Sequence, residues 1–192
     1  MPVRQKTLDL LDSELSYGYQ AYMGRDDADH EKLYRQNLTI SPKYWGLHGP
    51  AIEAANLRWS WVHFKELNAH MKLKPDRADK PGLYLFVVKP VVQFEYMPSF
   101  VFYVGMSGEH GSDRPLRDRL CDYLRIDSIK KRDAVHRTLL MYYDHVWVAY
   151  ASSGNSFGEI MKLEEALHGF FMPWAGKRDF PAKIKAARAA WG

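Results

Sequence analysis

The sequence predicts an α+β protein: a small antiparallel three-stranded sheet flanked by helices, preceded by a helical extension at the N-terminus. Apolar residues recur at helical spacing before residue 77, three runs of β-branched and aromatic residues follow between residues 82 and 150, and helical spacing returns between and after them. Apolar residues make up 46% of the chain and charged residues 26%, a balance typical of a globular protein.

The first 77 residues are predicted to be helical. Leucine and tyrosine residues form an apolar stripe with spacings of three and four between Leu8 and Tyr22. Pro50 suits the first turn of a second helix, which is expected to run to about Met71 with Ile52, Ala55, Trp59 and Val62 along one face. The polar stretch at 74–81 contains two prolines and is expected to be a linker, so residues 1–77 form the extension.

Three strands are predicted in the next part of the chain. Residues 82–88 are β-branched and aromatic without a helical period, and Pro90 ends them. Residues 100–104 form a second run that stops at Gly105, and antiparallel pairing with the first is the simplest arrangement. Residues 145–150 alternate between the two faces and predict the third strand.

Helices are predicted around these strands. Leu116, Leu120 and Leu124 form the buried row of a helix that begins near Pro115, and a second helix is expected at 128–142. Ser156 followed by Glu159 is a capping-box signature, and the helix it opens is expected to end before Pro173. The predicted units are therefore 1–77, a domain at 78–178 and a basic C-terminal helix at 179–192.

Positive charge is concentrated in two segments. The formal net charge is +4, residues 114–132 contain seven basic and three acidic side chains, and residues 177–192 contain five basic and one acidic. This pattern favours a polyanionic partner, although two solvated helix faces would produce it as well. The single cysteine, Cys121, excludes an internal disulfide and fits a reducing cytoplasm. The apolar runs are too short to span a membrane and no secretory signal is visible, so a cytoplasmic protein is expected.

Four short patterns follow one another in a fixed order. Gly82-Leu83-Tyr84 is followed by Tyr103-Val104-Gly105, and then by Arg119 and Tyr123, which are four residues apart and so share one helical face. Glu164 comes next, with Leu167 three positions and Pro173 nine positions later. Together, over about half of the chain, these residues resemble the conserved pattern of the GIY-YIG nuclease family. The spacing to Leu167 and Pro173 selects Glu164 rather than Glu165 as the family's glutamate.

The resemblance implies a GIY-YIG-like fold and hydrolysis of phosphodiester bonds in double-stranded DNA. By the family's precedent Tyr84 is the general base, Arg119 binds the scissile phosphate and Tyr103 orients water or phosphate, while Tyr123 is a hydrogen-bond partner. Glu164 holds a single Mg²⁺, for which Mn²⁺ substitutes. The residues expected to contact DNA phosphates are Arg114, Arg117, Arg125, Lys130, Lys131, Lys177 and Arg178.

The chain also departs from the family pattern. The segments between the two glycine–tyrosine patterns and before Arg119 are longer than usual, and Gly176 stands where the family commonly has an asparagine. The sequence around Glu164 is most similar to that of stand-alone restriction enzymes of the family. This similarity implies a role in restriction or phage defence and a homodimer that cuts both DNA strands. The alternatives are a structure-specific or mobile-element nuclease, a catalytically quiet DNA-binding module and an α+β interaction protein.

Overall fold

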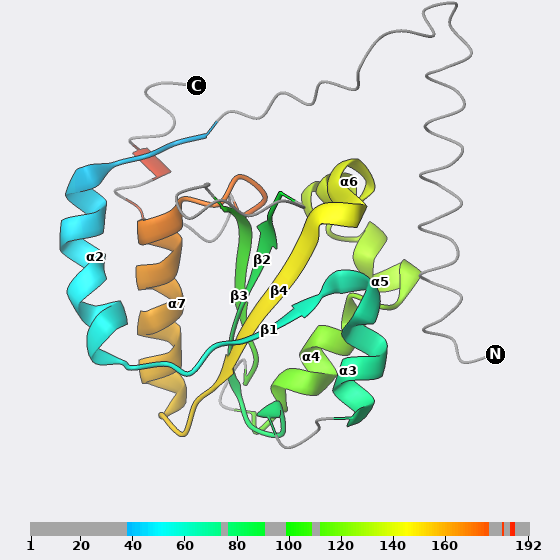
Figure 1. Ribbon diagram of the computed structural model, residues 1–192. Helices are drawn as coiled ribbons and strands as arrows, with labels where there is room; N and C mark the ends of the chain where they lie inside the picture. The colour runs from blue at the N-terminus through cyan, green and yellow to red at the C-terminus, as the bar shows by residue number, and fades with distance from the viewer. Residues whose placement is uncertain are drawn as a thin grey trace, which may run out of the picture.

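The computed structural model describes residues 38–73, 77–90, 99–108, 112–176, 182 and 185–186. Within them the protein is α+β, with one antiparallel sheet between two layers of helices (Figure 1). The predicted stripe at 8–22 lies outside the described residues, as does nearly all of the predicted C-terminal helix. None of the described helices is long and apolar enough to cross a membrane.

The sheet has four strands, so the prediction of three was wrong. Its strands, in the order in which they pair, are β1 (Ser60–His63), β4 (Val146–Ser152), β2 (Gly82–Val88) and β3 (Phe100–Met106). Every neighbouring pair is antiparallel, which confirms the predicted pairing of the two strands that carry the glycine–tyrosine patterns. The strands at 82–88, 100–106 and 146–152 correspond to the three that the sequence predicted.

The extra strand, β1, comes from the segment that was predicted to be a helix from Pro50 to Met71. That helix is wrong: α2 spans Pro42–Ala54, and Asn56 then adopts a left-handed conformation with φ 43°. After β1 the chain forms a 3-10 turn, η1 (Phe64–Glu66), and helix α3 (Leu67–Leu73). Asparagine tolerates the left-handed conformation better than most residues, and Asn56 in this conformation ends the helical path and lets the chain reach the sheet edge.

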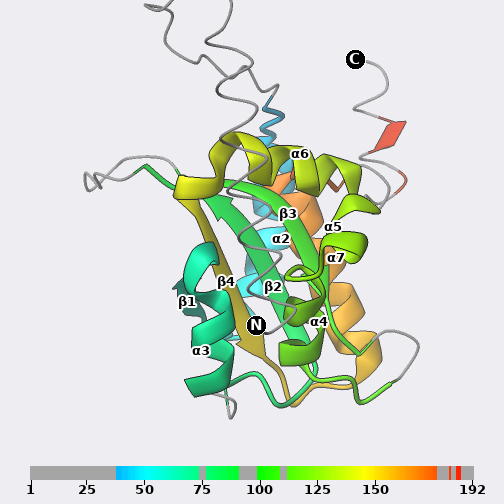
Figure 2. The same ribbon diagram turned by 90° about the vertical axis from the view of Figure 1, so that its right-hand side faces the viewer.

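Helices α4, α5 and α6 lie on the same face of the sheet as α3 (Figure 2). Helix α4 spans Leu116–Asp122, and the predicted buried row is confirmed because Leu116, Leu120 and Leu124 are fully buried. The single helix predicted at 128–142 is wrong. The chain instead forms α5 (Ile126–Lys130), α6 (Asp133–Tyr142) and the 3-10 turn η4 (Tyr143–His145), with a break at Lys131 and Arg132.

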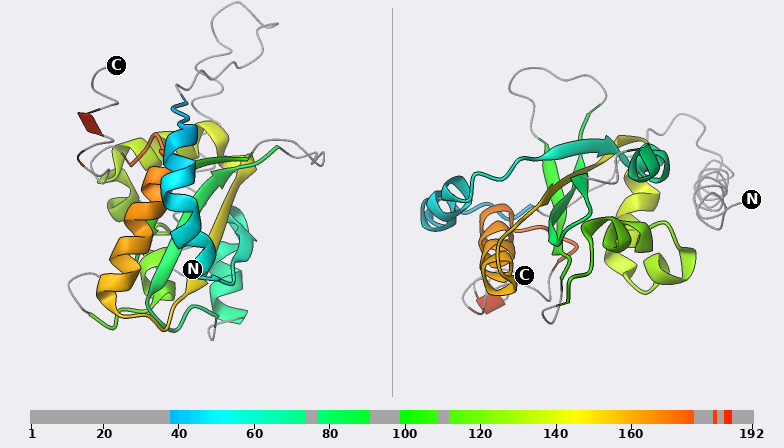
Figure 3. Two further views of the ribbon diagram at one scale, coloured as in Figure 1. Left: turned by 90° about the vertical axis from the view of Figure 1, so that its left-hand side faces the viewer. Right: turned by 90° about the horizontal axis from the view of Figure 1, so that it is seen from below.

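The opposite face of the sheet is covered by α7 (Phe157–Phe171), with α2 alongside it (Figure 3). The predicted capping box is confirmed, since the Glu159 carboxylate accepts hydrogen bonds from the backbone N–H and the hydroxyl of Ser156, both at 2.8 Å. The helix ends before Pro173, as predicted, with Met172 in the left-handed conformation. Ala175 N–H then donates to the Phe102 carbonyl, so the chain passes along the free edge of β3.

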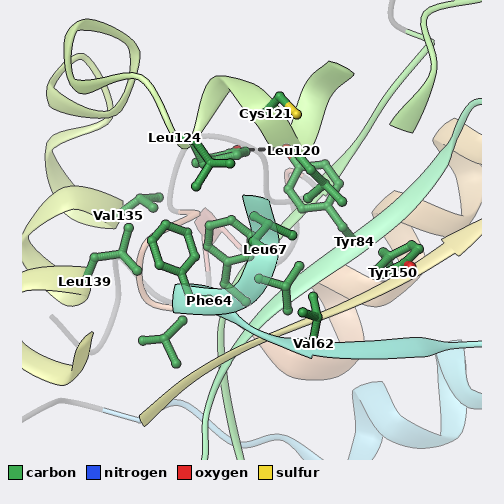
Figure 4. Close-up of a cluster of buried hydrophobic side chains, with 14 of the residues drawn as sticks. Val62, Phe64, Leu67, Tyr84, Leu120, Cys121, Leu124, Val135, Leu139 and Tyr150 are labelled. Atoms are coloured by element: carbon green, nitrogen blue, oxygen red, sulfur yellow. Dashed lines mark hydrogen bonds between the residues drawn. The ribbon is translucent and has the colours of Figure 1, made fainter. Parts of the chain in front are cut away.

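Side chains of β2 alternate between these two layers. Tyr84 and Phe86 point into the core beneath α4, whereas Leu83, Leu85 and Val87 pack under α7. Figure 4 shows Tyr84 reaching from its strand toward Leu120 and Cys121 of α4. In β3 an irregularity alters the alternation, because Phe86 pairs with Tyr103 but Val87 pairs with Val101. As a result Phe102 and Tyr103 both pack against the core beneath α4.

Candidate functional site

The candidate site is built around a pair of buried tyrosines that come from a strand and from the end of a helix. Tyr84 belongs to β2 and Tyr123 follows the last residue of α4, and both are fully buried. Their hydroxyl oxygens are 2.7 Å apart and share a hydrogen bond. The Nε–H of Arg119 donates to the Tyr84 hydroxyl oxygen at 3.2 Å. Arg119 and Tyr123, which are 35 and 39 positions after Tyr84 in the sequence, thus both contact the Tyr84 hydroxyl group.

Gly105 makes the position of Tyr84 possible. It pairs with Tyr84 across β2 and β3, and the tyrosine ring lies over it. A Cβ atom at Gly105 would lie 2.4 Å from the Tyr84 hydroxyl oxygen, far inside van der Waals contact. The glycine of the Tyr-Val-Gly pattern therefore leaves the space that the tyrosine of the Gly-Leu-Tyr pattern occupies.

Tyr103 completes the aromatic part of the site. Its ring centroid is 6.1 Å from those of Tyr84 and Tyr123, and the side chain is only partly buried. The Arg132 guanidinium carbon lies 4.5 Å from the centre of the Tyr123 ring, which is a cation–π distance. Sequence reasoning counted Arg132 among the basic residues but did not place it in the site, because no spacing rule connects it to Tyr123.

Burial controls the ionisation of the two phenols. It raises the pKa of Tyr84 well above its ordinary value, Tyr103 adds to the rise, and the charge and hydrogen bonds of Arg119 and Tyr123 oppose it. Burial likewise raises the pKa of Tyr123, with further increases from Tyr84 and Tyr103, while Arg132 lowers it. Both phenols are therefore neutral at physiological pH in this structure, and their protons are held within the cluster.

Asp122 is the electrostatic centre of the neighbouring surface. Its carboxylate lies 2.7 Å from Arg114 Nη2, 3.8 Å from Arg125 Nη1 and 4.0 Å from Arg119 Nη1. One negative charge is thus shared by three guanidinium groups. The helical spacing of three from Arg119 to Asp122 and from Asp122 to Arg125 was a signal in the sequence that could have identified this role.

The other predicted phosphate-contacting residues are less closely grouped. Arg117 Nε lies 3.4 Å from an Asp118 carboxylate oxygen, and Lys130 and Lys131 are exposed around the end of α5. Lys177 and Arg178 lie outside the described residues. Arg114 and Arg125 are thus the predicted basic residues, among those described, that the structure links to Arg119 through the common partner Asp122.

Glu164 lies on α7, on the other side of the sheet from the tyrosines. This helix packs against the sheet through Ile160, Leu163 and Leu167, and Glu164 is half-buried on its flank. His168 lies one turn later on the same flank of α7. Its ring packs against Gly176, where an added Cβ atom would lie 3.0 Å from His168 Cε1. Because Ala175 is hydrogen-bonded to Phe102 of the edge strand, this flank of α7 borders the free edge of β3.

The described residues contain no group of three or more histidine, cysteine, aspartate or glutamate side chains placed to bind a metal ion. Asp122 is occupied by its three arginines, and Glu164 is the carboxylate that the resemblance assigns to the cation. One carboxylate with water as the remaining ligands is a donor set that Mg²⁺ accepts, because this ion gives up its waters reluctantly. The residues present therefore fit the single-carboxylate magnesium site that the resemblance implies.

In comparisons with known proteins, no family model, no curated protein and no solved structure matched the chain. The resemblance to the GIY-YIG family consequently stays a hypothesis that stands on the quoted residues.

Proposed function

We propose that the protein is a magnesium-dependent endonuclease that hydrolyses phosphodiester bonds in double-stranded DNA. The observation that carries this proposal is the contact of Arg119 with the Tyr84 hydroxyl, which is itself hydrogen-bonded to Tyr123. These are three of the residues that the resemblance selects, and they come from two separate segments of the chain, β2 and α4 with its C-terminal cap. The consecutive strands β4-β2-β3 of the antiparallel sheet are compatible with the same proposal.

Arg119 is the residue we assign to the scissile phosphate. Its side chain is 14% exposed, so the guanidinium is near the surface while its Nε–H is used by Tyr84. A guanidinium can bind two phosphate oxygens in fork geometry and offset the negative charge that grows on them during hydrolysis. Its contact with Asp122, at 4.0 Å, is longer than that of Arg114 and is shared with Arg114 and Arg125.

Tyr84 has a narrower role in this proposal than a free general base would have. Burial raises the pKa of Tyr84, so the neutral phenol accepts a hydrogen bond from Arg119 and exchanges one with Tyr123. Loss of its proton would depend on the positive charge of Arg119. Tyr103, which is partly exposed beside it, is the phenol best placed to orient water or phosphate at the surface.

Glu164 would hold the magnesium ion at the free edge of β3. A bound Mg²⁺ would supply positive charge opposite the leaving oxygen. The chain's own contribution is to anchor Glu164 through the apolar packing of α7 on the sheet. A half-buried carboxylate on a packed helix loses little further mobility when it binds a cation, which favours binding.

The test is incubation of the purified protein with plasmid DNA and Mg²⁺, with Arg119→Ala and Glu164→Ala compared with wild type. We expect nicking or linearisation by wild type and losses of about 100-fold or more in both variants. Arg137→Ala is the matched control, because Arg137 is 67% exposed on α6 and pairs with Asp133 away from the site. Activity that is equal in all four proteins would overturn the proposal.

A second candidate is a DNA-binding module without catalysis. It is favoured by the position of Glu164 on the opposite face from Tyr84 and by Gly176 at the family's asparagine position. Salt-sensitive DNA binding without cleavage in Mg²⁺ or Mn²⁺ would select it. If cleavage is found, cutting at a short palindrome would indicate a restriction or phage-defence enzyme, whereas preference for branched DNA would indicate a structure-specific nuclease.

A further inference from the structure

A second cluster of polar side chains lies beside Tyr84 on the same face of the sheet. Tyr150 of β4 pairs directly with Tyr84 of β2 on one side and with Ser60 of β1 on the other. With Gly105 opposite Tyr84 in β3, these residues form a row that crosses all four strands. His70 of α3 lies against Tyr150, and Arg77 lies against Ser60. We call Ser60, His70, Arg77 and Tyr150 the second cluster.

The second cluster is connected by hydrogen bonds. His70 Nε2 is 2.7 Å from the Tyr150 hydroxyl oxygen, and the two rings meet edge to face with centroids 5.8 Å apart. Arg77 Nη1–H donates to Ser60 Oγ at 3.4 Å. The Ser152 hydroxyl donates to the Arg77 carbonyl at 2.7 Å, which ties the backbone of Arg77 to the end of β4. The guanidinium is therefore presented from an anchored segment.

The charge of Arg77 is the unusual part of this arrangement. No carboxylate of the described residues pairs with it, in contrast to Arg114, Arg119 and Arg125, which share Asp122. The residue is exposed, and its bond to Ser60 engages one of five N–H donors. At its surface the second cluster thus combines a guanidinium that no carboxylate of the described residues pairs with and the partly exposed Ser60 hydroxyl and His70 imidazole, which can donate to an oxygen anion. Tyr150 is fully buried and supports His70 from beneath.

We propose that the second cluster is a phosphate-binding subsite beside the cleavage site. Neighbouring strands are about 4.8 Å apart, so Ser60 and Tyr84, two strands from one another, are separated by roughly 10 Å. This separation lies within the reach of nearby phosphates of one bound nucleic acid, because each DNA strand carries a phosphate about every 3.4 Å along the helix axis. The identity of the ligand as nucleic acid rests on the proposed function, whereas anion binding by these side chains does not.

The first experiment uses inorganic phosphate as the probe and the full-length protein without divalent ions. Imidazole signals of His70, assigned by comparison with His70→Gln, would be followed by NMR during the titration. We expect a saturable shift in wild type and in the matched control Arg137→Gln, and at least a tenfold weaker affinity in Arg77→Gln. Arg77→Lys, which keeps the charge but loses the planar fork, should weaken binding less.

An unchanged His70 signal in wild type, or the same affinity in wild type and Arg77→Gln, would overturn the subsite. Thermal melting of each variant shows whether it has folded, and Arg77→Lys provides the comparison if Arg77→Gln has not. Arg77 is exposed, so neither substitution removes a core contact.

The second experiment separates this proposal from the nuclease proposal. Binding of a short labelled duplex would be measured over a range of salt concentrations without divalent ions. Arg77→Gln should lower the slope of log affinity against log salt by about 0.9, while Arg137→Gln leaves it unchanged. Phosphate binding without duplex binding would retain the subsite and reject the nuclease. Cleavage by wild type with an unaltered slope in Arg77→Gln would retain the nuclease and reject the subsite's role on DNA.

Discussion

At the scale of single residues, the candidate site depends on the side chains that hydrogen-bond to the Tyr84 hydroxyl group. The sequence patterns selected Tyr84, Arg119 and Tyr123 separately, and the structure brings all three into hydrogen-bond contact. The shared role of Asp122 was not predicted, because a carboxylate among basic residues gives no sign of how many it contacts. The pairing of His70 with Tyr150 was equally invisible, since 80 residues separate them.

Gly105 gives a direct test of the packing around Tyr84. Gly105→Ala would place a methyl group 2.4 Å from the Tyr84 hydroxyl oxygen, so the ring or the strand has to move. Overpacking of this kind costs about 1–3 kcal/mol in the free energy of unfolding, to be measured by urea denaturation. Gly154→Ala is the control, because nothing lies within 4 Å of a Cβ there. Equal stabilities of the two variants would contradict the described packing.

His168 should make stability depend on pH. Burial lowers the pKa of His168 to about 4 from 6.5, so the unfolded chain takes up a proton at a higher pH than the folded protein does. The contribution of neutral His168 to the free energy of unfolding is therefore complete above about pH 6.5 and is lost as the pH falls toward 4. The total loss is roughly 3 kcal/mol.

The measurement is the free energy of unfolding at pH 7 and at pH 4.5, for wild type and for His168→Gln. Carboxylates affect both proteins alike, so the variant should lose less stability than wild type over this interval. A loss of the same size in both proteins would show that His168 takes up its proton equally in the folded and unfolded states.

At the scale of secondary structure, the elements that the sequence predicted well have long or strongly marked patterns. The run at 82–88 is uniformly β-forming, and α7 has both a capping box and a proline after its end. Strand β1 was missed because four residues are too few to show alternation. In addition, Trp59 and Val62 happen to continue the helical spacing of α2. Its assignment depends on the pairing with β4, which is a tertiary interaction.

The N-terminus of α7 provides the prediction at this scale. Ser156→Ala removes the capping hydroxyl and should lower the free energy of unfolding by about 1 kcal/mol. Ser156→Thr is the matched comparison, because threonine keeps a hydroxyl that can donate to the Glu159 carboxylate and should preserve most of the stability. A Ser156→Thr variant as unstable as Ser156→Ala would indicate that the serine acts in another way.

At the scale of the whole molecule, the distribution of charge matters more than its sum. The chain carries a formal net charge of +4, and three of its arginines gather around Asp122 next to the candidate site. The concentration of basic residues at 114–132 was visible in the sequence. Their position next to Tyr84 was not, because it follows from the packing of α4 on the sheet.

Replacement of both Arg114 and Arg125 by glutamine tests the importance of this concentration. If each contacts one phosphate, the slope of log DNA affinity against log salt should fall by about 1.8. Arg137→Gln, a charge change on exposed α6, should leave the slope as in wild type. A double variant that retains the wild-type slope would place the DNA-binding surface elsewhere on the protein.

The row from Ser60 through Tyr150 and Tyr84 to Gly105 has a consequence for how this protein tolerates length changes. Each member occupies one pairing position, so a one-residue insertion inside a strand would turn that strand's member to the opposite face. Inserted residues in the connections at 89–99 and 107–115 would leave the row in register. A library of single insertions should therefore divide sharply, with inactive proteins from within the four strands and functional ones from the connections beside them.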